Sequence, residues 1–512
     1  YEYSDNFRWL GIWLMSNIRV TYSGLFFFIV GIVTIFTGLG FMLIVTRSLN
    51  PQEFGTWTLL YGLILYVTLI QPITSYWVTR EVARGEKSGK TAILSSGMFS
   101  SIGIIIFLLT AFFVGEQTDA DQEILLFGVI MIPVLFLNNV LLSINMGFKP
   151  HVVSFGTLSL EISKIPLAII FIYFMDFGVQ GVILSVTLAN IPSIIILGYF
   201  AREKITDTIK KEFIKKWIKL FWVSLYPGAN TLFRSLDLLI FSLSTGSVVG
   251  LAFYGAAWSV SSLVAQSSAI SSAVYPKLLA DEKSDYLQDN ITKIFYFAIL
   301  LSAISITFAR PGLFALNPVY EIAATLVIIM TMRVILETFN RAFEFFLIGT
   351  EKVDQDSKST FKNYAQSKLF MLPTFRLIQN IVYVVLLVVI LAFLNSSHSD
   401  FELLIYWVIL GLVVSIPLTI YLSILIHRRF NVKLDVKSIG KYLLVCILVF
   451  TPLFVLTETY LQYNDEIVEF LPDLLLFVGI GVVGYLFLTY VIDSKTKVFF
   501  NAIIQEIRNK TK

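Results

Sequence analysis

Charged residues within apolar stretches are the residues of this sequence whose types and spacing could do chemistry. The stretch TMRVILETFNRAFEFF contains Arg333, Glu337, Arg341 and Glu344. At 100° per residue, all four fall within an arc of roughly 80° and form one polar stripe on a helix. Arg341 and Glu344 lie near the polar end of the stretch and can reach water there. Arg333 and Glu337 remain as a pair inside the apolar part of the helix.

Three further basic residues occupy similar apolar stretches. Lys164 follows Glu161 by three residues, and Arg234 precedes Asp237 by three, so the members of each pair face one another on a helix. Arg376 has no acidic residue in its own stretch and is predicted to be available to a ligand or to Gln379. Depth, estimated at about 1.5 Å per residue from the cytoplasmic end, increases in the order Arg376, Arg333, Lys164 and Arg234.

Basic residues at such depths suit an anionic substrate, because guanidinium and ammonium groups bind phosphate oxygens. The predicted substrate-binding residues are Arg234, Arg333, Lys164 and Arg376. A carboxylate among them could bind H⁺ or Na⁺ and couple an ion gradient to transport. The predicted ion-coupling residues are Asp237 and Glu337. The alternative is that these charges form salt bridges that only stabilise helices, and the sequence leaves both interpretations open.

The composition places these charges in an integral membrane protein. Of 512 residues, 56% are hydrophobic and 14% charged, and the mean hydropathy is +0.79. A soluble protein of this size needs more polar surface. The single Cys446 excludes a disulfide framework, and the three histidines lie far apart. We therefore expect no metal, no cofactor, no catalytic site and no nucleic-acid partner.

Apolar runs of about 20 residues predict an all-α integral membrane protein with about fourteen transmembrane helices. The predicted spans are 22–45, 55–79, 92–115, 124–147, 152–175, 179–201, 221–243, 250–275, 291–313, 321–348, 370–394, 402–426, 439–458 and 472–492. Most of the 38 lysines and arginines lie in segments that are cytoplasmic if the N-terminus is inside. The positive-inside rule then predicts a multi-pass protein of the cell membrane with both termini cytoplasmic.

The two halves of the sequence are similar at a slowly drifting offset. EFGTWTLLY at Glu53 is similar to VGLAFYGAA at Val249, and ARGEKS ending at Ser88 is similar to LADEKS ending at Ser284. A duplication with small insertions leaves such a pattern. It predicts two six-helix bundles related by a pseudo-twofold axis along the membrane normal, plus two C-terminal helices. The predicted parts are an N-terminal lobe with an interfacial N-terminal segment (1–201), a linker (202–220), a C-terminal lobe (221–426), and helices 13 and 14 with a basic tail (427–512).

The predicted linker, AREKITDTIKKEFIKKWIK, is basic and amphipathic. Its lysines recur at helical spacing beside Ile214, Trp217 and Ile218. Helices of this kind lie in the surface of an anionic leaflet. We expect the linker to rest on the cytoplasmic leaflet.

This architecture and three local motifs resemble the polysaccharide (O-antigen type) flippases of the multidrug/oligosaccharidyl-lipid/polysaccharide (MOP) exporter superfamily. TRSLNPQEFGTWTLLYGLI is similar to that family's turn between spans 1 and 2, while VVGLAFYGAAWSV and AVYPKL are similar to the start and end of its span 8. The resemblance covers essentially the whole chain. It implies that the protein moves an oligosaccharide on a polyprenyl phosphate or pyrophosphate carrier from the inner to the outer leaflet. The glycan would pass between the two halves while the lipid tail stays in the bilayer.

Two of the motifs have a structural interpretation that we favour over a chemical one. Capping, helix-dipole and close-packing roles account for Asn50, Pro51, Glu53 and Gly55. The pair Asp119 and Asp121 resembles the metal-binding acidic pair of lipid-linked glycosyltransferases, but those enzymes usually carry a large soluble region beside it. A solvated acidic loop is the favoured interpretation of this pair.

Polar and aromatic residues in the spans would suit contact with sugar rings. They are Tyr61, Tyr66, Gln71, Tyr76, Trp77, Tyr254 and Trp258. An aromatic belt at the membrane interface explains several of them equally well.

The alternative function is an ion-coupled exporter of drugs or organic cations from the same superfamily. That branch typically has a cation-binding aspartate in span 1, where this chain has no acidic residue. A membrane enzyme of glycan polymerisation is disfavoured because no large outer loop is predicted. We expect a monomer whose partners are the lipid-linked oligosaccharide, membrane lipids and H⁺ or Na⁺ as coupling ion.

Overall fold

The computed structural model describes residues 31–501 except 32, 35, 207, 269–283, 350–364 and 431–434. Every secondary-structure element within these residues is a helix. The predicted interfacial N-terminal segment and the motif AVYPKL lie outside them. The chain divides into two compact units, Tyr1–Ala252 (unit 1) and Phe253–Lys512 (unit 2).

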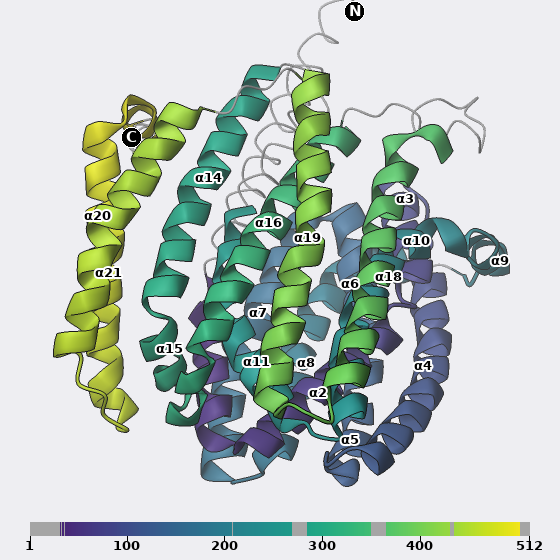
Figure 1. Ribbon diagram of the computed structural model, residues 1–512. Coiled ribbons are helices and arrows are strands. Elements are labelled where there is room, and N and C mark those ends of the chain that lie inside the picture. The colour runs from purple at the N-terminus through teal and green to yellow at the C-terminus, as the bar shows by residue number, and fades with distance from the viewer. Residues whose placement is uncertain are drawn as a thin grey trace, which may run out of the picture. The chain divides into compact units, whose positions relative to one another are not determined.

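Unit 1 consists of long helices joined by short turns (Figure 1). Its described helices are Phe36–Ser48, α2 (Pro51–Thr68), α3 (Pro72–Ala83), α4 (Gly89–Gln117), α5 (Gln122–Phe127), η1 (Gly128–Ile130), α6 (Met131–Phe148), α7 (Pro150–Ala168), η2 (Ile169–Phe174), α8 (Gly178–Ile205), α9 (Lys211–Lys219) and α10 (Phe221–Thr245). α7 packs along α8, and α6 packs against α3, α4 and α8. α10, predicted to begin the second lobe, packs against α2 and α3.

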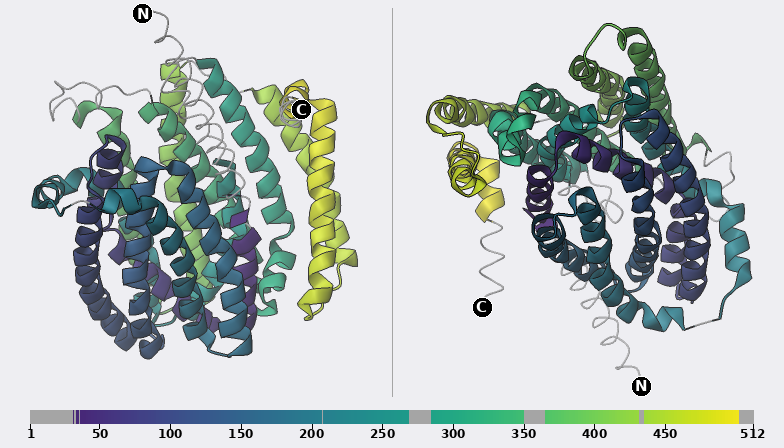
Figure 2. Two further views of the ribbon diagram at one scale, coloured as in Figure 1. Left: turned by 180° about the vertical axis from the view of Figure 1, so that it is seen from behind. Right: turned by 90° about the horizontal axis from the view of Figure 1, so that it is seen from below.

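Unit 2 begins within α11 and has the same all-helical character. Its described helices are α11 (Val249–Ser261), η3 (Ser262–Ser268), α14 (Ser284–Thr307), α15 (Ala309–Leu316), η4 (Pro318–Ala323), α16 (Ala324–Gly349), α18 (Lys368–Leu394), α19 (Asp400–Phe430), α20 (Val436–Tyr460) and α21 (Ile467–Ile492). α16 packs against α14, α18 and α19. α20 and α21, the last two helices in yellow-green and yellow, pack together and against α14 and α15 (Figure 2).

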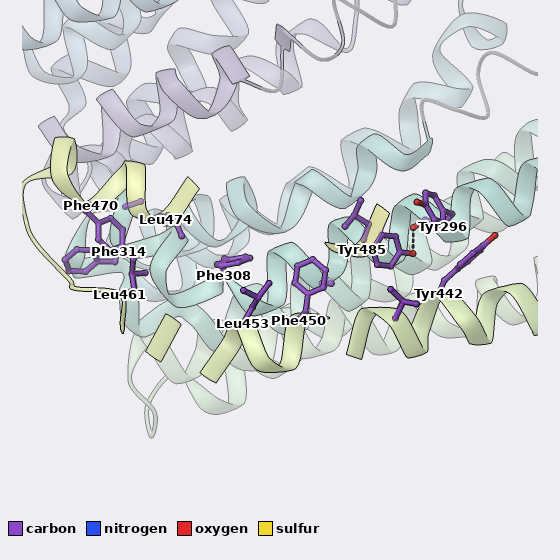
Figure 3. Packing of buried hydrophobic residues seen from close by; sticks show 14 residues of the cluster. Tyr296, Phe308, Phe314, Tyr442, Phe450, Leu453, Leu461, Phe470, Leu474 and Tyr485 are labelled. Carbon is purple, nitrogen blue, oxygen red and sulfur yellow. Dashed lines mark hydrogen bonds between the residues drawn. The ribbon is translucent and has the colours of Figure 1, made fainter. Parts of the chain in front are cut away.

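Apolar and aromatic side chains hold α20 and α21 to the rest of unit 2. Phe314 of α15 contacts Phe470 of α21, with ring centroids 4.9 Å apart. Further along, Tyr485 lies 5.3 Å from Tyr296 of α14 and donates a hydrogen bond of 3.1 Å to the Tyr296 carbonyl oxygen. Figure 3 shows these residues in one continuous cluster. The predicted helices 13 and 14 are therefore an integral part of unit 2.

Ten of the described helices are long and apolar enough to cross a membrane, and the bent pair α2–α3 makes eleven. The chain is therefore a multi-pass membrane protein. Each of the fourteen predicted spans is helical over most of its described residues, with turns at 69–71 and at Phe308 inside two of them. The helix Phe36–Ser48 is too short to qualify on its own. α10 is long enough but too polar, because it carries Asn230, Arg234 and Asp237.

The start of α2 has the capping structure that its sequence predicts. The Asn50 side chain accepts a hydrogen bond of 3.0 Å from the Glu53 amide, and the Glu53 carboxylate accepts one of 2.9 Å from the Asn50 amide. Pro51 occupies the first helical turn. A Cβ atom added to Gly55 would lie 2.1 Å from the Val248 carbonyl oxygen, so only glycine permits this approach. The structural interpretation of this motif is confirmed.

The predicted span 55–79 is broken in two. α2 ends at Thr68 and α3 begins at Pro72, with a bend of 56° between them. Proline has no backbone N–H to donate to the preceding turn, so Pro72 accounts for the break.

The two aspartates of the predicted acidic loop have different structural roles. Asp121 caps α5 by accepting hydrogen bonds from the amides of Glu123 and Ile124 at 2.9 and 3.2 Å. Asp119 binds the turn between α10 and α11, where its carboxylate accepts a hydrogen bond of 2.7 Å from the Val248 amide. The expectation of a solvated acidic loop is therefore wrong for Asp119, which is bonded to another turn.

The predicted linker contains α9, and its tryptophan packs against protein. Trp217 is 0% exposed and belongs to the core of unit 1. Its indole nitrogen donates a hydrogen bond of 3.2 Å to Glu81, which also accepts one of 3.1 Å from Lys216. Trp217 thus packs against protein, because Glu81 provides a buried acceptor for the indole N–H, while the position of the linker on the leaflet stays a prediction.

Candidate functional site

In unit 1, α10 carries the residues Arg234 and Asp237 of the predicted pair and packs against α2. Asp237 is 4% exposed, and its carboxylate accepts a hydrogen bond of 2.9 Å from the Leu238 amide. One turn away, the Tyr66 hydroxyl of α2 donates to the Ser235 carbonyl oxygen. A Cβ added to Gly62 of α2 would lie 3.1 Å from the Leu238 side chain. Both residues therefore lie on a polar helix whose residues Ser235 and Leu238 are held against α2.

The second predicted cation of unit 1, Lys164, is part of a three-residue polar cluster. Its ammonium group lies 2.8 Å from the Glu161 carboxylate, as the spacing of three residues predicts. The Thr37 hydroxyl donates a hydrogen bond of 2.7 Å to the same carboxylate oxygen. Lys164 also lies 5.2 Å from the centre of the Phe41 ring. The cluster thus joins α7 to the first described helix of the chain.

In unit 2, Arg333 of α16 is enclosed by three neighbours. Its Nε lies 3.0 Å from the Glu337 carboxylate, and its guanidinium lies 5.2 Å from the centre of the Tyr383 ring. Gly411 of α19 faces it so closely that an added Cβ would lie 2.3 Å from Nη1. Arg333 is 5% exposed. The predicted pair with Glu337 is present, and it lies within the helix packing of unit 2.

Arg376 has an acidic partner that the sequence does not indicate. Its guanidinium contacts Glu344 of α16 through Nη2 at 2.8 Å and Nε at 2.9 Å. The expectations that Arg376 lacks a carboxylate and that Glu344 reaches water are both wrong, because α16 and α18 place the two side chains together. With side chains 24% and 18% exposed, this pair is the most accessible of the three ion pairs described here.

The predicted aromatic residues fall into separate environments. In unit 2, Tyr254 stacks on Trp407 with ring centroids 4.3 Å apart and an interplanar angle of 2°. In unit 1, Tyr76 lies 4.3 Å from the Arg80 guanidinium. Tyr61 is 50% exposed. Trp258 packs against the small apolar cluster that contains Val334.

A polar contact beside the bend between α2 and α3 has no counterpart among the predicted pairs. The Asn139 amide of α6 donates a hydrogen bond of 2.6 Å to the Gln71 side chain. Gln71 belongs to the predicted polar surface, but Asn139 lies 68 positions away in the sequence. Its only sequence signal is an Asn-Asn pair in an otherwise apolar span. The bend thus has a polar environment in unit 1.

No three His, Cys, Asp or Glu residues are grouped as metal ligands in the described part of the chain. The arrangement can instead exchange ion-pair partners. Lys164 and Arg234 belong to unit 1, and Arg333 and Arg376 belong to unit 2.

Comparisons of the sequence and of the structure with known proteins give different results. No family model matches the sequence, and no curated protein matches it. Among solved structures, a lipid II flippase MurJ in an inward closed conformation aligns with 14% identity and a TM-score of 0.60, covering 93% of this chain and 100% of its own. An inward-facing multidrug resistance MATE family transporter of the MOP superfamily aligns with 16% identity and a TM-score of 0.57, covering 77% of this chain and 95% of its own.

The chain has the MOP transporter fold. A further MOP superfamily transporter, from Pyrococcus furiosus, aligns with a TM-score of 0.50 and 15% identity over 80% of this chain and 95% of its own. The predicted fold class is confirmed by these similarities. At such identities they establish the fold alone.

Proposed function

We propose that this protein is a flippase. It moves an oligosaccharide linked to polyprenyl phosphate or pyrophosphate from the inner to the outer leaflet by alternating access, for the assembly of a surface glycan. It acts as a transporter without a catalytic step, and we propose that it works as a monomer in the cell membrane.

The extent of the structural similarity carries this proposal. The lipid II flippase aligns over 93% of the chain, whereas the multidrug transporter aligns over 77%. The additional length is enough to include α20 and α21, which are packed into unit 2. A substrate carried on a lipid also accounts for basic residues in otherwise apolar helices, since its phosphate is anionic.

The ion pairs provide a way to bind that phosphate. A phosphate offers oxygen acceptors like those of a carboxylate, so it can replace Glu344 on Arg376 without leaving the arginine unpaired. We propose that Arg376 makes this exchange first, because it is more exposed than Arg333. In unit 1, we propose Lys164 and Arg234 as the substrate-binding residues.

The carboxylates provide a way to couple the exchange to an ion. Binding of H⁺ or Na⁺ to Glu337 neutralises its charge and releases Arg333 for the phosphate. Asp237 plays the corresponding part beside Arg234. Both residues are buried or nearly so, which restricts ion entry to states in which their helices separate.

The test is translocation in proteoliposomes. A polyprenyl pyrophosphate oligosaccharide with a fluorescent sugar is placed in both leaflets, and its exposure is followed with a membrane-impermeant quencher under a pH or Na⁺ gradient. We expect Arg333→Ala and Arg376→Ala to slow translocation at least tenfold, because each removes one charged contact to phosphate. Arg310→Ala is the matched control, since Arg310 pairs with Glu321 and Glu458 outside the predicted site.

Three results contradict parts of the proposal. Unchanged translocation in both arginine variants removes them from the site. Equal loss in Arg310→Ala shows a general effect of lost arginine on the fold. Export of organic cations without movement of the lipid-linked sugar replaces the proposed function with multidrug export, which the similarity to the MATE transporter also supports.

We also propose that the chain is built from two repeated lobes. The lobes at 1–201 and 221–426 are joined by the linker 202–220 and followed by 427–512. Packing of α10 against α2 and α3 places the unit boundary later in the chain than the lobe boundary. We propose that the sequence repeat comes from an ancestral duplication, whereas the two units are defined by the contacts within the folded chain.

A further inference from the structure

Helix α9 is fixed to unit 1 by one face only. Trp217 is fully buried beside α3, and Phe213 stacks on it with ring centroids 6.0 Å apart. Lys216 and Trp217 both donate to Glu81 of α3. Just before the helix, the Lys210 amide donates a hydrogen bond of 3.0 Å to the Thr91 hydroxyl of α4. These contacts set the rotation of α9 about its own axis, and Figure 1 shows it beside α3 and α4.

The opposite face of α9 carries a row of exposed lysines. Lys211, Lys215 and Lys219 follow one another at intervals of four residues, and all three are exposed. At 100° per residue they fall within roughly 80°, on a side of the helix away from Trp217. None of the three forms an ion pair with any residue that the structure describes. The lysine row is thus a positive surface whose charges the described chain leaves unneutralised.

Apolar side chains border the lysine row. Ile218 is 52% exposed, and Ile214 beside it is half-buried. α9 begins shortly after α8, a candidate membrane span, and is followed at once by Phe221, which is 48% exposed. A helix in this position lies at the edge of the hydrocarbon, where lysine ammonium groups reach headgroups and isoleucines reach acyl chains.

We propose that the lysine row of α9 is a binding surface for anionic phospholipid headgroups. The three ammonium groups are complementary in charge to lipid phosphates, and the bordering isoleucines favour a bilayer over a soluble acidic protein. Glu81 and Trp217 hold the row toward the lipid by fixing the opposite face. The surface is distinct from the proposed transport site and does not depend on the substrate.

The experiment reports the environment of α9 directly. Cys446 is replaced by serine, and Ile218→Cys is labelled with an environment-sensitive fluorophore. The full chain is reconstituted into vesicles of phosphatidylcholine alone or of an equal mixture with phosphatidylglycerol. We expect a blue shift of emission and protection from the neutral quencher acrylamide in the anionic vesicles only. High salt should reverse both effects, because it screens exposed charges.

Matched variants assign the effect to the lysine row. The variant with Lys211, Lys215 and Lys219 all replaced by glutamine should lose the dependence on anionic lipid, since each lysine near such a surface changes partitioning roughly fivefold. The control replaces three exposed basic residues by glutamine, Arg84 and Lys87 of the α3–α4 turn and Lys90 at the start of α4. It removes the same charge and should retain the shift.

Three outcomes overturn the proposal. Emission that is identical in both kinds of vesicle shows that α9 does not bind anionic lipid. Equal loss in the control variant shows a response to net charge and not to this row. A shift of the same size on adding polyglutamate to zwitterionic vesicles shows that the row binds acidic polymers instead. Size-exclusion profiles identical to the parent chain establish that each variant is folded.

Discussion

Arg333 occupies a space that exists because position 411, a glycine, has no side chain. Gly411 lets α19 approach the guanidinium, and an added Cβ would lie 2.3 Å from Nη1 and 2.8 Å from Cζ. The guanidinium cannot move freely, since Glu337 and Tyr383 hold it on other sides. The glycine is therefore as much a part of the arginine environment as its carboxylate partner.

Gly411→Ala should destabilise the protein by about 1–3 kcal/mol, because an extra methyl group in a packed site forces neighbours to shift. Gly440→Ala is the control, since a Cβ at Gly440 in α20 meets no atom within 4 Å. We expect this control to be neutral or slightly stabilising, because alanine favours helix over glycine. Thermal unfolding in detergent measures both. Equal unfolding temperatures for the two variants would contradict the packing argument.

Sequence spacing predicted the ion pairs within helices and missed the pair between helices. Glu161 with Lys164 and Arg333 with Glu337 are separated by three and four residues, so helix geometry alone brings each pair together. Arg376 and Glu344 are 32 residues apart on different helices. Their contact depends on how α16 and α18 pack, which a single sequence does not specify.

At the scale of elements, the turn between α4 and α5 connects three parts of unit 1. Asp119 accepts from the Val248 amide, donates its own amide to the Gly246 carbonyl oxygen at 2.9 Å, and accepts from the Gln52 side chain at 2.8 Å. Gly246 has a φ of +71°, which glycine adopts without strain. The α10–α11 turn is thereby fixed against the ends of α2 and α4.

Asp119→Ala and Asp121→Ala should accelerate hydrogen exchange in different segments of the chain. Loss of Asp119 removes the acceptor of the Val248 amide, so hydrogen exchange there should accelerate roughly tenfold or more. Loss of Asp121 should instead accelerate exchange at Glu123 and Ile124. Hydrogen exchange with mass spectrometry distinguishes these segments. The same exchange pattern in both variants would show that the two aspartates act as one acidic loop.

A polar network joins the N-terminal end of α20 to the C-terminal end of α21. Asp493, which is 2% exposed, accepts hydrogen bonds from Ser438, Lys441, Tyr442 and Thr496. Burial raises the pKa of Asp493, but the hydrogen bonds from Thr496, Lys441 and Tyr442 outweigh it and hold this pKa below its ordinary value. The network therefore favours the ionised carboxylate.

The contact between these two helix ends should lose stability in acid. Lys495, 2.6 Å from Asp435, lowers the pKa of that carboxyl to about 2. Because the folded-state pKa values of Asp435 and Asp493 are depressed, their contribution is present above the unfolded value of about 3.9 and is lost as pH falls toward about 2. The exposure of Lys495 limits the Asp435 share to less than about 1 kcal/mol.

The unfolding temperature measured across this acid range checks the pH prediction. Asp493→Asn should flatten the profile and lower the unfolding temperature at neutral pH, because it removes an ionised acceptor that Lys441 contacts at 3.1 Å. Asp465→Asn, in the connection between α20 and α21, is the control at an exposed aspartate. An unchanged profile in Asp493→Asn would exclude this residue as a source of the pH dependence.

At the scale of the whole molecule, apolar length was enough to predict the fold class. Each predicted span is helical over most of its described residues, because a bilayer requires about 20 apolar residues per crossing. Hydropathy did not indicate the break before Pro72, although Gln71-Pro72 carried the signal. It also did not place α10 against α2 and α3, since that contact depends on packing.

Orientation in the membrane is a prediction from the charge distribution alone. In a chain with Cys446→Ser, a single cysteine at position 121 should react with an impermeant maleimide in intact cells, and one at position 215 only after permeabilisation. Both positions are exposed, so access to the reagent depends on the side of the membrane. The reverse pattern would overturn the assignment of both termini to the cytoplasm.

The hydrogen bonds of Asp119 also determine where the chain can accept an epitope tag. Short turns between membrane helices are the usual insertion points, but tolerance depends on whether the backbone there is bonded elsewhere. The backbone amide and carbonyl of Asp119 both serve distant partners, so an insertion at 118–120 should impair folding. The turn after α18 differs, because the amides of Ser397 and His398 bond only to Leu394. A tag between Ser396 and Ser397 should therefore leave the protein intact and provide a handle for purification.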